Sequence, residues 1–125
     1  MSIKLNHTIV SCKDKKASSK FLTDILGLRP AKAFGPFLAV ELDNDVTLDF
    51  AEWGGEIEVA HFAFLVSETV FDAIFVRVKA RGLTYWADPF HERPGEINRR
   101  DSGRGFYFED PSGHNLEVLT RPYGG

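Results

Sequence analysis

An internal repeat constrains the fold of this chain more than any other feature. His7 lies in a segment that alternates apolar and polar residues, and His61 lies in a second such segment 54 positions later. Each segment is followed by apolar residues at helical spacing, and each of these stretches ends in Gly-Leu, at Gly27 and at Gly82. We therefore expect two copies of one unit, in which a strand leads into a helix and further strands follow.

The pattern of each copy predicts one helix and four strands, which makes an α+β fold of duplicated βαβββ modules. The first module, 1–54, and the second, 55–125, form one domain, which suits a length of 125 residues. The strand at 57–66 is apolar on both faces, so we expect both faces to be covered. The predicted elements are strands at 3–11, 29–34, 37–42 and 46–51 with a helix at 15–26, then strands at 57–66, at 84–87 and on either side of the turn 110–113, with a helix at 68–81.

Composition argues against several classes of partner. Lys and Arg number 15 against 18 Asp and Glu, and the charges are scattered along the chain, which disfavours nucleic-acid binding. The longest apolar run, at 62–66, is far too short to cross a bilayer. The single cysteine, Cys12, excludes an internal disulfide and fits a reducing compartment. We expect a soluble cytoplasmic protein that binds a small molecule.

Two carboxylates in the middle of strands complete a chemical pattern. Asp49 lies in the fourth predicted strand of the first module and Glu117 in the last strand of the second, and each module also carries its strand histidine. Side-chain alternation puts apolar neighbours on the helix side and leaves these four groups on the opposite side, where they would converge. Two imidazoles with one or two carboxylates suit a divalent transition metal. Each residue alone also fits a hydrogen-bonded histidine or a solvated acid, and their matched placement is what favours a metal site.

The final hairpin carries the most specific motif. Residues 105–119 read Gly-Phe-Tyr-Phe-Glu-Asp-Pro-Ser-Gly-His-Asn-Leu-Glu-Val-Leu, with the turn formed by Asp-Pro-Ser-Gly. Together with His7 and His61, this run resembles the vicinal-oxygen-chelate superfamily. That superfamily holds glyoxalase I, fosfomycin-resistance proteins, extradiol dioxygenases, methylmalonyl-CoA epimerase and bleomycin-binding proteins. The resemblance covers essentially the whole chain. It implies a cupped mixed sheet that is usually completed by a second subunit. The resemblance therefore also implies a homodimer in which both chains can contribute metal ligands to one site.

The resemblance also implies roles for individual residues. His7, His61 and Glu117 match the three metal ligands of the fosfomycin-resistance and dioxygenase branches. Asp49 stands where glyoxalase I places a fourth ligand that also serves as base. Because its side chain is one methylene shorter, Asp49 fits that ligand position less well, and the alternatives are a residue that supports a ligand by a hydrogen bond or a base that acts through water. Tyr107 and His91 are available for the acid–base tyrosine and histidine of the extradiol dioxygenases.

The polar stretch 88–104 is an insertion relative to the first module. Its arginines predict a lid that fixes a carboxylate or phosphate of the substrate, and Arg100 and Arg104 are the first candidates because they are nearest the final hairpin. The alternative is a solvated loop whose arginines pair with its own acids. Trp53 and Phe90 are candidates for a substrate-binding wall, with simple packing as the alternative.

These observations predict a metal-dependent enzyme that acts on a small oxygenated metabolite. The substrate would bind Fe, Mn, Ni or Zn through two adjacent oxygens, and the metal would stabilise the charge that develops in a dioxygenase-like or lyase/isomerase-like reaction. The alternative is a non-catalytic small-molecule binding protein or antibiotic-resistance protein, of the bleomycin-resistance kind, with the same fold.

Overall fold

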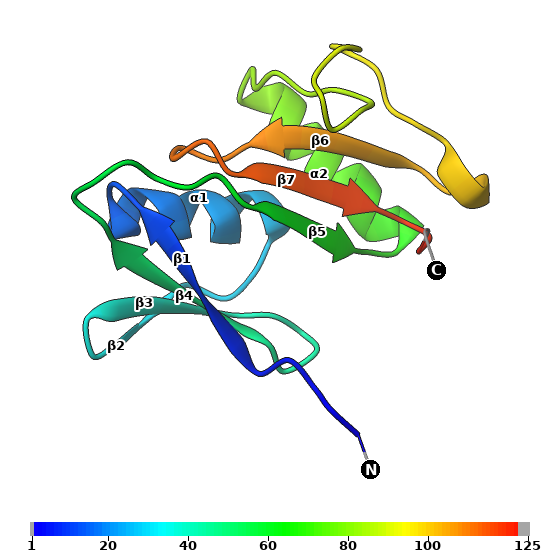
Figure 1. The fold of residues 1–125 in the computed structure, drawn as a ribbon. Helices are drawn as coiled ribbons and strands as arrows, with labels where there is room; N and C mark the ends of the chain where they lie inside the picture. The colour runs from blue at the N-terminus through cyan, green and yellow to red at the C-terminus, as the bar shows by residue number, and fades with distance from the viewer. Residues whose placement is uncertain (1, 123–125) are drawn as a thin grey trace. The chain divides into compact units, whose positions relative to one another are not determined.

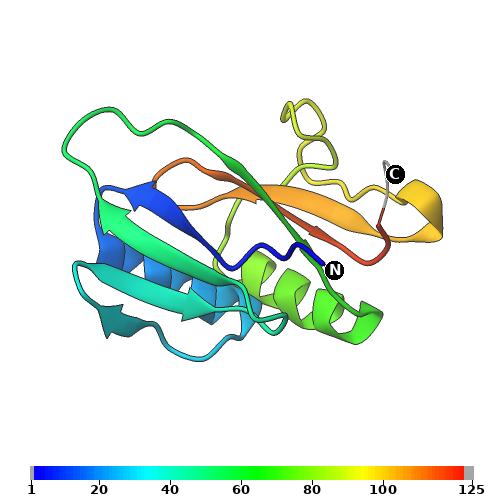
Figure 2. The ribbon, with the colours of Figure 1, turned by 60° about the horizontal axis from the view of Figure 1, so that its bottom comes forward.

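A computed structural model describes residues 2–122 of the chain. The chain divides into two compact units, Met1–Glu58 and Val59–Gly125. Each unit packs a helix against one face of a sheet, as Figures 1 and 2 show. No helix within residues 2–122 is long and apolar enough to span a membrane.

The first unit forms a four-stranded sheet with the strand order β1-β4-β3-β2. Strand β1 is parallel to β4, and the other neighbours are antiparallel. The helix begins after Asp14, whose side chain accepts the N–H groups of Lys16 and Ala17, and it ends at Gly27, which has a positive φ of 72°. The elements are β1 (His7–Cys12), α1 (Lys15–Leu26), β2 (Lys32–Phe34), β3 (Phe37–Glu41) and β4 (Thr47–Glu52).

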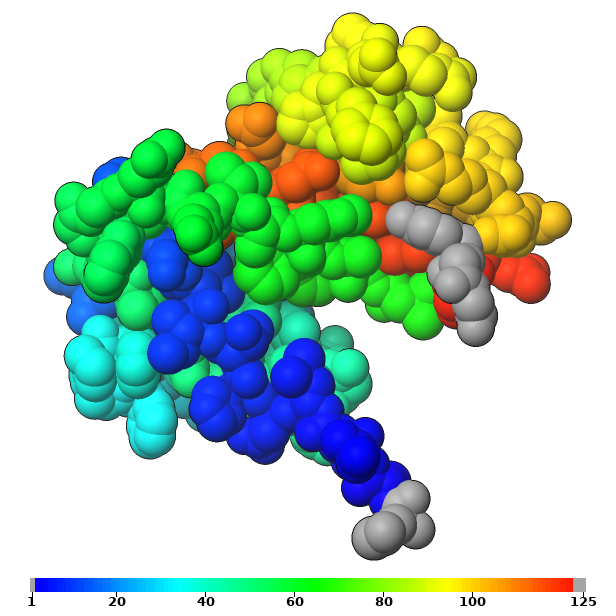
Figure 3. All heavy atoms as spheres, viewed as in Figure 1, coloured from blue at the N-terminus to red at the C-terminus, as the bar shows by residue number. Residues whose placement is uncertain are grey.

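The second unit forms a three-stranded sheet with the order β5-β7-β6, in which β5 is parallel to β7 and β6 is antiparallel to it. Its core lies between α2 and the sheet, where the rings of Phe71 and Phe106 meet edge to face with centroids 5.3 Å apart. Between α2 and β6 the chain forms a long loop, drawn in yellow in Figure 3. The elements are β5 (His61–Leu65), α2 (Glu68–Ala80), a 3₁₀ turn (Arg100–Ser102), β6 (Gly105–Glu109) and β7 (Asn115–Leu119).

The structure confirms the α+β fold and both helices, but it corrects the strands. Strands β1 and β5 begin at the histidines themselves, because ladder pairing starts at His7 with Thr47 and at His61 with Asn115. The prediction that both faces of the fifth strand are covered was wrong. Strand β5 is the edge of its sheet, and Leu65 remains 60 % exposed.

The predicted strand at 84–87 is reduced to isolated bridges from Trp86 to Pro94 and to Tyr107. The Asp88 side chain explains why no longer ladder forms. Its carboxylate accepts the backbone N–H groups of Glu92 and Arg93, and this turns the chain away directly after the bridge.

Candidate metal-binding site

In the second unit, β5 and β7 bring His61 and Glu117 together. The strands are adjacent and parallel, and Ala63, two residues beyond His61, is the partner of Glu117 in the ladder. His61 Nε2 lies 3.0 Å from Glu117 Oε1. Glu117 lies between Leu116 and Val118, which are buried, so its carboxylate leaves the sheet on the face opposite to theirs.

The His61–Glu117 pair fits a metal site on chemical grounds. The Glu117 side chain is only 1 % exposed, and a buried carboxylate is costly unless a cation or hydrogen-bond donor compensates it. His61 Nε2 and Glu117 Oε1 are only 3.0 Å apart, so both atoms would be within reach of one ion. Imidazole nitrogen and carboxylate oxygen are both accepted by Fe, Mn, Ni and Zn.

Tyr107 extends this arrangement along β6. It is the ladder partner of Glu117, and its ring centroid lies 5.7 Å from that of His61. Arg100 Nη1 donates a hydrogen bond of 2.9 Å to the phenolic oxygen of Tyr107. The loop arginine and the strand tyrosine predicted as site residues are therefore in direct contact.

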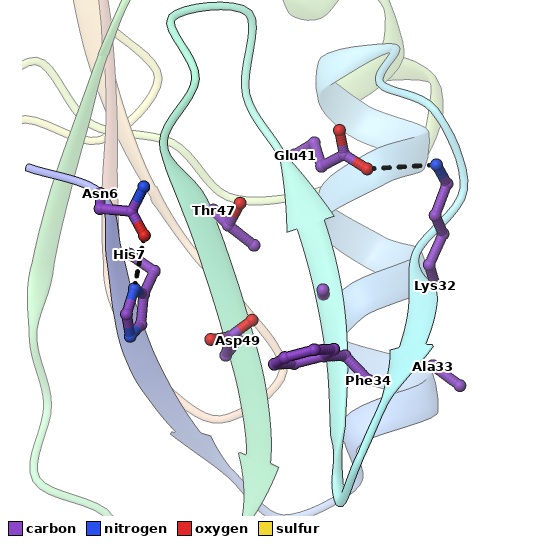
Figure 4. A pocket seen from close by; sticks show the side chains of 9 residues that line it. Asn6, His7, Lys32, Ala33, Phe34, Glu41, Thr47 and Asp49 are labelled. Carbon is purple, nitrogen blue, oxygen red and sulfur yellow. Dashed lines mark hydrogen bonds and ion pairs between the residues drawn. The ribbon is translucent and has the colours of Figure 1, made fainter.

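In the first unit, His7 and Asp49 line a hollow of about 420 Å³ on the face of the sheet opposite α1. Figure 4 shows both side chains in this hollow. Asp49 is nearly buried and is flanked in the ladder by Ile9 and Ala39. The histidine and carboxylate that the sequence assigned to this module are thus parts of one cavity wall.

Asn6 is a site residue that the sequence analysis missed. Its amide oxygen lies 2.8 Å from His7 Nδ1. An amide oxygen can only accept, so Nδ1 carries the proton, and in the neutral ring the lone pair is on Nε2. Such a hydrogen bond on the far nitrogen is how proteins orient metal-binding histidines. The asparagine directly before His7 was the available signal.

Other predicted residues lie elsewhere. Arg104 contacts helix α2, with Nε 2.8 Å from Glu68 and Nη2 2.8 Å from Asp72, and its guanidinium stacks over the ring of Phe71. Hydrogen bonds from the side chains of Thr120 and Arg104 lower the pKa of the Glu68 carboxyl. Arg104 thus ties the start of β6 to the helix.

The remaining aromatic and loop candidates are surface groups, except His91, which is packed against Trp86. The side chains of Trp53 and Phe90 are largely exposed. Arg93 pairs with Glu96 at 2.9 Å, as the solvated-loop alternative predicts for this arginine. His91 stacks on Trp86 with centroids 3.7 Å apart, and its Nε2 lies 3.1 Å from the amide oxygen of Asn115.

His114 has a structural role in the turn before β7. It is buried, and its Nδ1 accepts the backbone N–H of Ala60 at 3.0 Å, which ties the turn before β7 to the start of β5. Among residues 2–122, no three His, Cys, Asp or Glu side chains form a group that could hold a metal ion. Each unit holds two of the predicted donors, His7 and Asp49 in the first and His61 and Glu117 in the second.

The fold is that of a known class of proteins. The chain belongs to the Glyoxalase/Bleomycin resistance protein/Dioxygenase superfamily, whose family model matches residues 4–118. Structures described as Oxidase ChaP-H1 and Oxidase ChaP-H2 are similar over nearly their entire length. ChaP-H1 is 58 % identical with a TM-score of 0.97, covering 99 % of this chain and 100 % of that one. ChaP-H2 is 62 % identical with a TM-score of 0.97, covering 100 % of this chain and 98 % of that one.

Two further proteins with similar sequence or fold are named FosA and FosX. Glutathione transferase FosA from Serratia marcescens is 30 % identical over 121 residues, which is 91 % of this chain and 78 % of that protein. The structure described as fosfomycin resistance protein FosX from Mesorhizobium loti is 22 % identical with a TM-score of 0.71, covering 98 % of this chain and 95 % of that one. The second likeness shows a shared fold.

Proposed function

We propose that this chain is a metal-dependent oxidase that acts on a small oxygenated metabolite. His7, His61 and Glu117 would hold a divalent Fe, Mn, Ni or Zn ion. The observation that carries the proposal is the buried Glu117 carboxylate 3.0 Å from the imidazole nitrogen of His61. The two oxidases with 58 % and 62 % identity support oxidation over the lyase or isomerase reactions of the superfamily. When bound, the metal would act as a Lewis acid toward two adjacent substrate oxygens and would stabilise the negative charge that develops on them.

Tyr107 and Arg100 would handle a proton next to the ligand pair. A guanidinium only donates, so the phenolic oxygen accepts from Arg100 and the phenol's own proton is directed to another acceptor. A substrate oxygen near His61 would be such an acceptor, and Arg100 would act through Tyr107. Asp49, nearly buried in the wall of the hollow, would serve as a base through water or as a further ligand.

Trp53, Phe90 and Arg104 would take no direct part in metal binding or in proton transfer. Trp53 and Phe90 are exposed aromatic groups that would contact a substrate only at the rim. Arg104 would keep its structural partners on α2.

We also propose a cytoplasmic homodimer with shared sites and neither nucleic-acid nor membrane partners. Strands β1 and β5 are edges of their sheets, and each exposes a large apolar side chain, Ile9 and Leu65. Unpaired edges of this kind favour pairing with another strand. Because His7 and His61 lie on these edge strands, a second copy would bring its own metal ligands with it.

The test begins with metal content. Protein purified without chelator should contain stoichiometric divalent metal by elemental analysis, and added Mn(II) should raise the Tm of the stripped protein. His61→Ala and Glu117→Ala should abolish this rise, because each removes a donor. At a hundredfold excess over Kd, the wild type should gain about 2.7 kcal/mol of stability.

His91→Ala is the matched control, since it removes a histidine of the same unit that stacks on Trp86. It should keep the Mn(II)-induced rise in Tm. An unchanged rise in His61→Ala would contradict the proposal. Oxygen uptake by metal-loaded protein with aromatic and aliphatic diols then separates an oxidase from a non-catalytic binder, and conjugation of glutathione would favour the chemistry named for the FosA relative.

A further inference from the structure

The hollow of the first unit is built from two rows of side chains that cross the sheet. Ladder pairing puts His7, Thr47 and Glu41 in one row. The next row runs from Asp49 through Ala39 to Lys32. Because ladder partners point to the same side of a sheet, these side chains share one face. The small side chain of Ala39 leaves the middle of this face open.

The two ends of the hollow differ in chemistry. His7 and Asp49 lie at one end, and the ion pair of Lys32 with Glu41, 3.2 Å between Nζ and Oε1, lies at the other, as Figure 4 shows. A volume of about 420 Å³ is within the range of roughly 300–1,000 Å³ that is usual for small-molecule sites. The hollow can therefore hold a molecule with polar groups at its edges and an apolar middle.

Phe34 supplies an aromatic surface in this hollow. It is the last residue of β2, and Gly35 follows it with a positive φ of 56°, which makes a tight turn into β3. The side chain of Phe34 is 66 % exposed although it is large and apolar. In Figure 4 its ring extends toward Asp49. An exposed ring at the side of a cavity loses its contact with water when a flat apolar ligand covers it.

We infer that Phe34 selects a planar aromatic substrate, which lies against the Phe34 ring over Ala39 with its oxygen substituents toward His7 and Asp49. This inference rests on the proposed function and adds the substrate class to it. The Lys32–Glu41 pair bounds the far end of the site. An aliphatic substrate of the same size would place its oxygens equally well but would lack the stacking contact.

The test compares two probes of two fused six-membered rings that both carry adjacent hydroxyl groups, the aromatic 2,3-dihydroxynaphthalene and the saturated trans-2,3-decalindiol. Calorimetric titration of the Mn(II)-loaded protein without oxygen gives both Kd values. Wild type should bind the aromatic diol at least tenfold more tightly. Phe34→Leu should lose about tenfold in affinity for it, because an aromatic contact is replaced by an aliphatic one. Phe34→Tyr keeps the ring and should stay within about threefold.

The Mn(II) affinity of each variant is measured in parallel and should not change, since Phe34 is no metal ligand. Equal binding of the two probes, or equal aromatic affinity in wild type and Phe34→Leu, would overturn this inference while Mn(II) binding stays normal. Failure of the wild type to bind Mn(II) would overturn the proposed function instead.

Discussion

Asn6 shows how a single side chain can prepare a ligand. Its amide oxygen holds the proton of His7 on Nδ1, which presents the Nε2 lone pair. Without this acceptor the ring could adopt the other tautomer and other orientations. Orientation of a metal-binding histidine by a second residue is commonly worth about 10–100-fold in metal affinity.

We therefore predict that Asn6→Ala weakens Mn(II) binding by about tenfold, at the lower end of that range because the hydrogen bond is exposed. Asn6→Asp retains an oxygen acceptor and should bind Mn(II) at least as tightly as the wild type. Titration of stripped protein followed by Tm measures both. Equal affinity in Asn6→Ala and wild type would show that His7 needs no such support.

At the scale of elements, the hairpin β6–β7 depends on one carboxylate. Asp110 Oδ1 accepts the backbone N–H groups of Ser112 at 3.0 Å and of His114 at 2.8 Å. Burial raises the pKa of the Asp110 carboxyl above its ordinary value. The turn therefore uses the oxygen atom, while the negative charge is unfavourable in the folded state.

This predicts opposite effects for two variants. Asp110→Ala loses both of these hydrogen bonds and should lower the free energy of unfolding by about 1–3 kcal/mol. Asp110→Asn keeps Oδ1 and should be close to wild type. Because the folded pKa is raised, the wild type loses stability relative to Asp110→Asn as pH rises through about 4 and the range just above it. Urea unfolding of both proteins between pH 3 and 7 measures this difference. A difference that shrinks with rising pH would contradict the assignment.

The helices were predictable because their determinants are local. Asp14 and Ser67 as N-caps, together with the 3.6 period, lie within the segments that they define. The ends of the strands were not predictable, because a strand begins where its pairing with a strand distant in the sequence begins, as β1 does at His7 with Thr47 of β4. The segment 84–87 has a strand-like pattern, but the Asp88 carboxylate turns the chain after it.

The same distinction applies to the site. The pairing of His61 with Glu117 was foreseeable from alternation and the repeat, since both side chains were assigned to the side opposite the helices, where they were expected to converge. The partners of Arg100 and Arg104 were not. Whether a loop arginine meets the hydroxyl of Tyr107 or the carboxylates of α2 depends on the path of residues 88–104. The hollow beside Phe34 likewise depends on the register that aligns Ala39 with Asp49.

For the whole molecule, the proposed shared site makes a prediction by complementation. His7→Ala and Glu117→Ala homodimers should each fail to bind Mn(II). When the two are mixed and allowed to exchange subunits, each heterodimer should regain one site, composed of His7 from one chain and Glu117 from the other. Elemental analysis of the mixture should then show up to one metal ion per heterodimer. No recovery after proven exchange would indicate that each site uses the ligands of one chain.

The position of both imidazoles on outermost strands would also couple cofactor loading to protein concentration. If the third metal ligand comes from the second subunit, dilution that separates the subunits also releases the metal ion. Bound metal in turn stabilises the dimer. Such a protein would lose its cofactor when scarce and keep it when abundant, without any dedicated regulatory site.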